Sequence, residues 1–276
     1  MVNILVPTDF SDLSRIAIDY AVKVANKLNG TLTLLHVVTV IQPTRASMRL
    51  RLEALEEELM RVAKEDMELL MAELAGKLKT AKPIDHKIVQ GSSFNATVKN
   101  EAKKLRSGLI VIGTRGANGL KKVVLGSNTA SLIEISHIPV LAVPELAEFT
   151  SFKKLVYATD LRHLDSELNA LLPYIKIFES SVHVFHAVSS EKAVAAAEAK
   201  IKAAIEKVDY NKFKVRVVVD KDVDRAVEAY VKEISSDLLA TFTHEHSVYE
   251  KLFNRSLTRK LAFQSRLPLL ALRQTV

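Results

Sequence analysis

The chain has 276 residues, enough for two domains of about 100–150 residues each. Hydrophobic residues make up 48% and charged residues 26%, and the absence of cysteine excludes both a disulfide framework and thiolate catalysis. The net charge of +7 is spread over amphipathic helices rather than gathered beside aromatic residues, so we expect no nucleic-acid partner. The opening MVNILVPTDF does not resemble a signal peptide, and no apolar run nears the ~18 residues of a membrane helix. We therefore expect a cytoplasmic protein without a membrane partner.

Short apolar runs rich in β-formers alternate with helix-period segments through the first half of the chain. The expected strands are Asn3–Pro7, Thr31–Val38, Asp85–Gln90, Leu109–Gly113 and Val140–Val143. The expected helices are Leu13–Leu28, Arg49–Leu78, Phe94–Leu105 and Asn128–Ile135. This alternation is typical of a parallel sheet with right-handed crossovers and with helices on both faces.

The second half repeats the first. ILVPTD at 4–9 matches LVYATD at 155–160, and LTLLHV at 32–37 matches VHVFHA at 182–187. Farther along, the offset falls from 150 to 129, so the first copy has 21 more residues between its second and third strands. The strands expected in the second copy are Lys154–Ala158, Ser181–Val188, Lys214–Val219, Asp237–Thr241 and Leu269–Leu272.

These patterns predict an α/β fold of two tandem, open, five-stranded parallel sheets with helices on both faces, in domains 1–146 and 152–276. The segment Glu145–Phe152 is the expected joint. Both copies keep an apolar fifth strand, Pro139–Val143 and Pro268–Leu272. An unpaired strand of this kind is an exposed sheet edge, so we expect the two domains to form a pseudo-dimer within the chain.

Four of the eight glycines lie between Gly113 and Gly126, in a loop that follows the fourth strand. In an open parallel sheet, ligands bind beyond the carboxyl ends of the strands. Gly126 and Ser127 precede a helix whose N-terminus would suit a phosphate group, and Ser127 would either cap that helix or contact a phosphate oxygen. On glycine spacing alone, a tight turn with an ordinary helix cap explains the loop equally well.

The spacing Gly113-x2-Gly116-x9-Gly126-Ser127 resembles the signature of ATP-binding universal stress proteins of the UspA superfamily. Pro7-Thr8-Asp9, His36-Val37 and Pro139-Val140 also stand where that family has them, and the resemblance covers nearly the whole chain as two units. It implies a Rossmann-like fold of the adenine-nucleotide alpha-hydrolase type. It also implies ATP as the ligand, with or without Mg²⁺, in a nucleotide-dependent stress-response protein that can assemble into homo-oligomers.

The resemblance further implies which residues hold the nucleotide. Asp9 would contact the nucleoside end, and the backbone of Val37 would meet the adenine edge. Asn128 stands where the family is often apolar, so a side-chain role there does not follow from the resemblance. Arg115 is either a phosphate ligand or a solvated loop residue. The full set of expected binding residues is Pro7, Thr8, Asp9, Val37, Gly113, Arg115, Gly116, Gly126, Ser127, Asn128 and Thr129.

The second copy has lost this glycine set. At the offset of 129, the three signature glycines become Phe242, Glu245 and Arg255, although Ser256 and Thr258 remain. Asp160 matches Asp9, but an aspartate after a strand often only caps the next helix. Bulk and negative charge at these positions oppose the close approach of an anionic ligand, so we expect one site per chain, in the first domain.

Three functions remain open at this point: an ATP-binding regulator with little or no hydrolysis, a slow ATPase or phosphotransferase, and an interaction protein that binds no nucleotide. Hydrolysis needs a positioned metal ion and a group that orients water, and the sequence offers Asp9 without a second evident carboxylate. We therefore expect no catalytic residues. His244 and His246 could hold a metal only in a particular loop geometry, and a degenerate phosphate loop is the simpler interpretation. His36 and His186, at matching strand ends, are expected to be packed or hydrogen-bonded.

Overall fold

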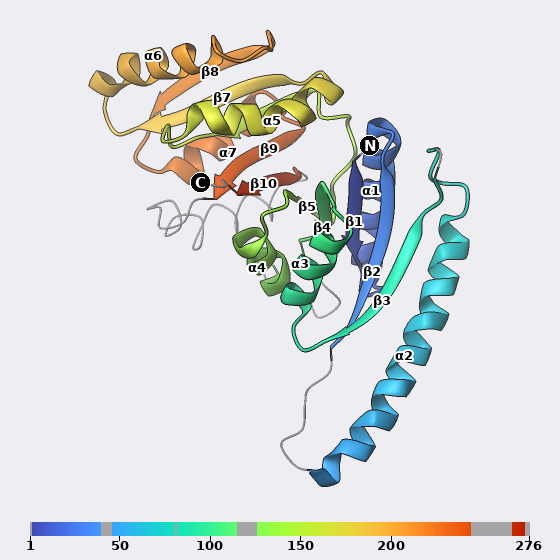
Figure 1. The fold of residues 1–276 in the computed structure, drawn as a ribbon. Coiled ribbons are helices and arrows are strands. Elements are labelled where there is room, and N and C mark those ends of the chain that lie inside the picture. The colour runs from blue at the N-terminus through green and yellow to red at the C-terminus, as the bar shows by residue number, and fades with distance from the viewer. Residues whose placement is uncertain (1, 40–45, 81, 115–125, 244–266, 274–276) are drawn as a thin grey trace.

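A computed structural model gives the fold of the chain (Figure 1). The residues that it describes are 2–39, 46–80, 82–114, 126–243 and 267–273. Strands and helices alternate in both halves, as the sequence predicts. No helix within these ranges is both long enough and apolar enough to cross a bilayer.

The first half contains five strands and four helices. Their bounds are β1 Asn3–Pro7, α1 Asp12–Leu28, β2 Thr31–Thr39, α2 Ala46–Leu74, β3 Asp85–Gly91, α3 Phe94–Lys104, β4 Leu109–Gly113, α4 Ser127–Ile135 and β5 Val140–Val143. Ser11 caps α1 by accepting a hydrogen bond from the Ser14 N–H, and Asn29 ends that helix in the left-handed conformation with φ of 47°.

The second half repeats this order within the described residues. Its elements are β6 Lys154–Ala158, α5 Leu164–Phe178, β7 Ser181–Val188, η1 Glu191–Ala193, α6 Val194–Ile205, β8 Phe213–Val219, α7 Val223–Glu233, β9 Leu238–Thr243 and β10 Leu269–Arg273. The largest difference between the halves is the helix after the second strand, because α2 has 29 residues and α6 has 12.

The ten strands form one continuous sheet in the order β3-β2-β1-β4-β5-β10-β9-β6-β7-β8. All pairs within a half are parallel, whereas β5 and β10 pair antiparallel across the joint. Leu141 lies opposite Leu270, and Val140 and Ala142 lie opposite Ala271 and Leu269, so a local twofold axis passes between the two leucines. The α/β class is confirmed, and the two predicted five-stranded sheets are joined edge to edge through their fifth strands.

The antiparallel joint also places the carboxyl ends of the strands on opposite edges of the sheet in the two halves. Within the first half, the chain moves outward from β1 to β3 and then returns to add β4 on the other side of β1. The strand order therefore reverses between β1 and β4, and the carboxyl ends of these two strands are the expected place for a ligand.

Two layers of buried side chains cover the faces of the sheet. On one face, the buried side chains come from the sheet and from α1, the end of α2, α5 and α6. On the other face, they come from the sheet and from α3, α4 and α7. The first layer runs without a break across the joint, where the rings of Phe152 and Phe178 meet with centroids 4.8 Å apart. Tyr174 of α5 also donates a hydrogen bond to the carbonyl of Gly108, 3.0 Å away, in the other half.

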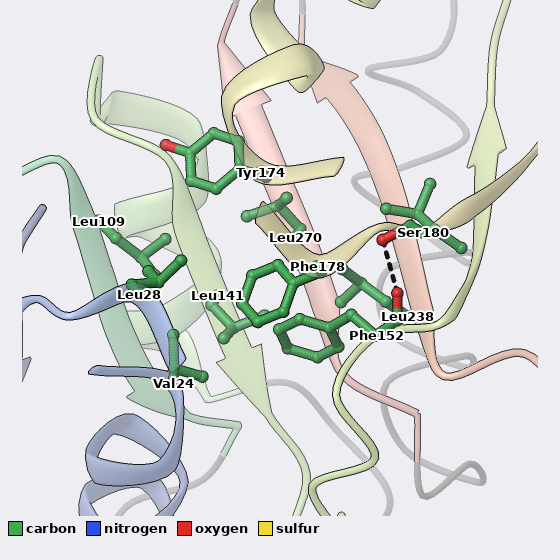
Figure 2. A pocket seen from close by; sticks show the side chains of 11 residues that line it. Val24, Leu28, Leu109, Leu141, Phe152, Tyr174, Phe178, Ser180, Leu238 and Leu270 are labelled. Carbon is green, nitrogen blue, oxygen red and sulfur yellow. Dashed lines mark hydrogen bonds between the residues drawn. The ribbon is translucent and has the colours of Figure 1, made fainter. Parts of the chain in front are cut away.

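A small apolar cavity of about 10 Å³ remains at this joint (Figure 2). Val24 and Leu28 of α1 line it from one half, and Phe178 and Leu270 line it from the other. A volume of this size is close to that of a single water probe. The two halves thus share one nearly filled core, which makes the joint a packed interface and not a flexible linker.

Five helix ends in the first half differ from the sequence prediction, among them the start of α1 at Asp12 and the end of α3 at Lys104. Helix α2 ends at Leu74 rather than at Leu78, because Gly76 takes a left-handed conformation with φ of 76° and the Lys77 N–H turns back to the Leu74 carbonyl. At its other end, α2 begins at Ala46 and so extends farther from the sheet than predicted. Helix α4 begins at Ser127, one residue early.

Candidate functional site

The turn after β1 presents Asp9 at the carboxyl edge of the sheet. Thr8 is buried, and its hydroxyl accepts a hydrogen bond from the Phe10 N–H at 3.1 Å and lies 2.9 Å from Ser14 Oγ. Phe10 has a positive φ of 63°, which turns the chain sharply back into α1. Asp9 is left exposed, and its Oδ1 accepts hydrogen bonds from both the N–H and the hydroxyl of Ser11.

The second half builds the same turn but places its aspartate differently. Thr159 is buried and accepts from the Leu161 N–H at 3.0 Å, and Leu161 has a φ of 66°. The carboxylate of Asp160, however, lies 3.4 Å from the guanidinium of Arg162, and its side chain is only 6% exposed. Arg162 stands where the first half has Ser11. This substitution is visible in the sequence, since the offset of 151 aligns Ser11 with Arg162.

Helix α4 opens toward the same edge as Asp9. Gly126 is its N-cap, in an extended conformation, and the Gly126 carbonyl accepts the first helical hydrogen bond from Ala130 at 3.0 Å. The N–H groups of Ser127, Asn128 and Thr129 have no partner within the described part of the chain. No acidic residue lies in the first turn, so the positive end of the helix dipole is not neutralised there.

Two hydroxyl residues of the expected set have defined local positions. Ser127 is the first helical residue, and Gly126 is the cap, which leaves the second of the two roles expected for Ser127, contact with a phosphate oxygen. Thr129 is 2% exposed, and its hydroxyl donates to the Gly113 carbonyl at 2.8 Å. It ties the first turn of α4 to the end of β4. The Gly126 N–H, which donates to the Thr114 carbonyl at 2.7 Å, adds a second tie.

Phe242 fills the equivalent position in the second half. It replaces Gly113 at the offset of 129, is 7% exposed, and packs edge to face on Tyr157 with ring centroids 5.8 Å apart. The Tyr157 hydroxyl donates to the buried carboxyl group of Glu167. Burial, followed by the charge of Glu167, raises the pKa of Tyr157 well above its ordinary value. A large side chain therefore stands where the first half has only a backbone hydrogen.

The end of β2 completes the edge beside Asp9. Pro7 and Val37 are buried, so of Val37 only the backbone could meet a ligand at this edge. His36 Nδ1 lies 2.9 Å from the Thr8 carbonyl oxygen, and the His36 ring stacks on Phe10 at 4.4 Å. His186 makes the same contact with Thr159 at 2.8 Å. The interpretation of both histidines as hydrogen-bonded structural residues is confirmed.

Several expected residues fall outside the described part of the chain. Arg115 and Gly116 of the glycine loop lie in the gap from 115 to 125, and the histidine pair and the remaining degenerate positions of the second copy lie in the gap from 244 to 266. Among the residues that the structure does describe, no group of three or more His, Asp or Glu side chains could hold a metal ion.

Comparison with known proteins agrees with the resemblance seen in the sequence. The sequence profile of the universal stress protein family matches residues 1–144. This chain belongs to that family. Over 145 residues it is 32% identical to a universal stress protein of Methanocaldococcus jannaschii. The aligned region covers 51% of this chain and 81% of that protein. It is also 32% identical over 146 residues to one of Bacillus subtilis, covering 51% of this chain and 97% of the relative.

The fold comparison extends the likeness to the whole chain. A crystal structure of a universal stress protein from Archaeoglobus fulgidus superposes with a TM-score of 0.66 over 99% of this chain and 98% of that one, at 17% identity. At this identity the match shows the fold alone. This universal stress protein thus consists of two family-like halves joined into one ten-stranded sheet.

Proposed function

We propose that this universal stress protein binds one ATP molecule per chain, at the carboxyl edge of β1 and β4, and uses it as a regulatory ligand in the stress response. The observation that carries the proposal is the contrast between matched aspartates. Asp9 is exposed at the edge where the strand order reverses, whereas Asp160 is buried against Arg162. The first half thus has an exposed carboxylate at this position, and the second half has one whose side chain is largely buried.

The first turn of α4 supports a phosphate group at the other end of the same site. Three N–H groups there, those of residues 127 to 129, have no partner in the described part of the chain. Unpaired amides at a helix N-terminus, together with the helix dipole, favour an anion. Thr129 and Gly126 fix the turn against β4, so these amides are held in place before a ligand arrives. Ordered donors of this kind bind with a smaller loss of conformational entropy.

We propose regulation by binding, rather than turnover, for a chemical reason. Phosphate release from ATP requires a metal ion and a group that orients the attacking water. Asp9 is an exposed carboxylate at this edge, and Ser11 already donates two hydrogen bonds to it. Binding alone needs neither group, because turnover requires interactions that are stronger in the transition state than in the ground state. Without cysteine, the chain also suits a reducing compartment, and we propose the cytoplasm.

Calorimetric titration with ATP and Mg²⁺ tests the proposal, and the repeat supplies a matched control. Asp9→Ala should weaken ATP binding at least tenfold, since hydrogen bonds to a charged group contribute about 1.5–3 kcal/mol. Asp160→Ala, at the equivalent position, should leave the affinity within about twofold of the wild type. Two equivalent sites per chain, no binding at all, or equal losses in the two variants would overturn the proposal.

A further inference from the structure

The N-terminal half of α2 stands clear of the sheet (Figure 1). Between residues 53 and 62 no side chain is buried, and Ala63 is the first buried residue in the part of the helix whose side chains the structure describes, which begins at residue 53. From there Met67, Leu70 and Leu74 pack into the core beside α1. We name residues 53–62 the α2 arm. The arm extends past the carboxyl edge of β2 and β3 (Figure 1). Over most of its surface, no other described residue packs against it.

The arm carries an apolar stripe. Leu55, Leu59 and Val62 are 51%, 42% and 40% exposed, and their spacing of four and three residues places them on one face of the helix. Leu69, on the same face, is 68% exposed. Of the seven large apolar side chains that are exposed in the described part of the chain, four therefore lie on α2. Clustered exposure of this kind marks an interaction site far more often than single exposed residues do.

Folding of the unit does not require the arm. The matching helix α6 covers its part of the sheet with 12 residues, whereas α2 has 29. The 21 additional residues of the first copy fall between its second and third strands, which is where the arm is. An exposed helix with an apolar stripe costs solubility without adding to the core. The second half shows that the fold is complete without such a helix. The exposed apolar stripe is therefore better explained by binding of a partner than by folding.

The charge around the stripe indicates the chemistry of that partner. From residue 53 to residue 74, acidic side chains outnumber basic ones eight to two, although the whole chain has a net charge of +7. Arg61 is already paired with Glu58 at 2.6 Å and with Glu65 at 2.5 Å. Glu53, Glu56 and Glu57, together with Met60, Arg61 and Lys64, line a groove of about 370 Å³ between the arm and Gln90 at the end of β3. None of these three glutamates has a partner within the described residues.

A second copy of this chain would bring the same acidic arm to the contact, and like charges would oppose pairing. A basic amphipathic helix would match both properties of the arm, its apolar stripe and its negative charge. We propose that the α2 arm is a docking site for a basic amphipathic helix of a partner protein. The apolar face of that helix packs on Leu55, Leu59 and Val62, and its lysines and arginines face the acidic side chains beside this stripe, which are Glu56, Glu58 and Asp66.

A fluorescein-labelled 18-residue peptide of leucine and lysine, with leucines at helical spacing, is the probe, and a peptide of the same composition in scrambled order is its control. In fluorescence anisotropy, the full chain should bind the patterned peptide at least tenfold more tightly. The variant Leu55→Ser/Leu59→Ser/Val62→Ser should remove this preference. The matched variant Leu146→Ser/Ile177→Ser, which changes exposed apolar residues outside the arm, should retain it. Equal binding of the two peptides, or an equal loss in both variants, would overturn the proposal.

Charge reversal gives an independent test. Glu53→Lys/Glu56→Lys/Glu57→Lys should weaken peptide binding at least tenfold at low salt, whereas Glu191→Lys/Glu198→Lys/Glu206→Lys on the second half should change it less than twofold. Circular dichroism checks that each variant is folded, and unchanged ATP affinity separates this surface from the nucleotide site. Light scattering reports the alternative occupant. A wild-type dimer that the triple serine variant converts to monomers would assign the arm to a second copy and refute the proposal.

Discussion

Thr129→Val tests whether the tie between β4 and α4 preorganises the nucleotide site. Valine keeps the shape of threonine and removes the hydroxyl that donates to the Gly113 carbonyl at 2.8 Å. Because Thr129 is 2% exposed, water cannot readily replace the donor at the carbonyl. An unsatisfied buried acceptor costs about 1–3 kcal/mol, so the free energy of unfolding should fall by about 2 kcal/mol, a large part of the 5–15 kcal/mol typical of a domain.

The same change should loosen the first turn of α4 and the amides of residues 127 to 129. If half of this free energy is also lost from ATP binding, ATP should bind about fivefold more weakly, because 1.4 kcal/mol corresponds to a factor of ten. Urea denaturation measures the first effect and calorimetric titration the second. Thr129→Ser keeps the hydroxyl and should lie close to the wild type in both. A valine variant that loses stability but binds ATP within about twofold of the wild type would refute the preorganisation argument.

Three further outcomes are expected. Leu270→Ala, at the local twofold axis and beside the existing cavity, should lower the free energy of unfolding by about 4 kcal/mol in urea denaturation, and a loss below about 1 kcal/mol would contradict the shared core. Burial, then Lys214 and Lys154, lowers the pKa of His183 below its ordinary 6.5, so the unfolded state binds the proton first as the pH falls. Stability should therefore decline below about pH 6.5, and less steeply in His183→Gln. Steady-state phosphate release should stay below about 1 s⁻¹, and faster release that Asp9→Ala abolishes while ATP still binds would establish an ATPase.

Strand positions were predictable because each strand is a compact apolar run that ends at a turn-forming residue. The bounds of β1, β4 and β5 agree with the prediction to the residue. Helix α2 was placed less well, because its apolar periodicity continues to Leu78 after the helix has ended at Leu74. Gly76 was a visible stop signal, and a glycine at that position should have outweighed the periodicity.

The site was predictable only in outline. Glycine spacing and the first aspartate located it, and the repeat identified the half that keeps it. The roles of individual side chains depended on conformation, which spacing does not determine. The ion pair between Arg162 and Asp160 crosses a turn, and the bond from Thr129 to Gly113 spans 16 residues. Alignment of the two halves does reveal Arg162 in place of Ser11, so that contact was the more accessible of the two.

The antiparallel joint at Leu141 and Leu270 resembles the interface of a symmetric dimer, but its two sides can evolve independently. In a dimer of identical subunits, every substitution appears twice, so neither subunit can lose a site or gain an appendage alone. Here one reading frame encodes both sides of the axis, so a substitution can occur in one half alone. The short covalent connection keeps the two halves in contact while they diverge. Phe242 on one side and the long helix α2 on the other are changes of this kind. The two sides therefore remain symmetric in the backbone of the sheet, where they must fit, and differ at the end of a strand and in a connecting helix.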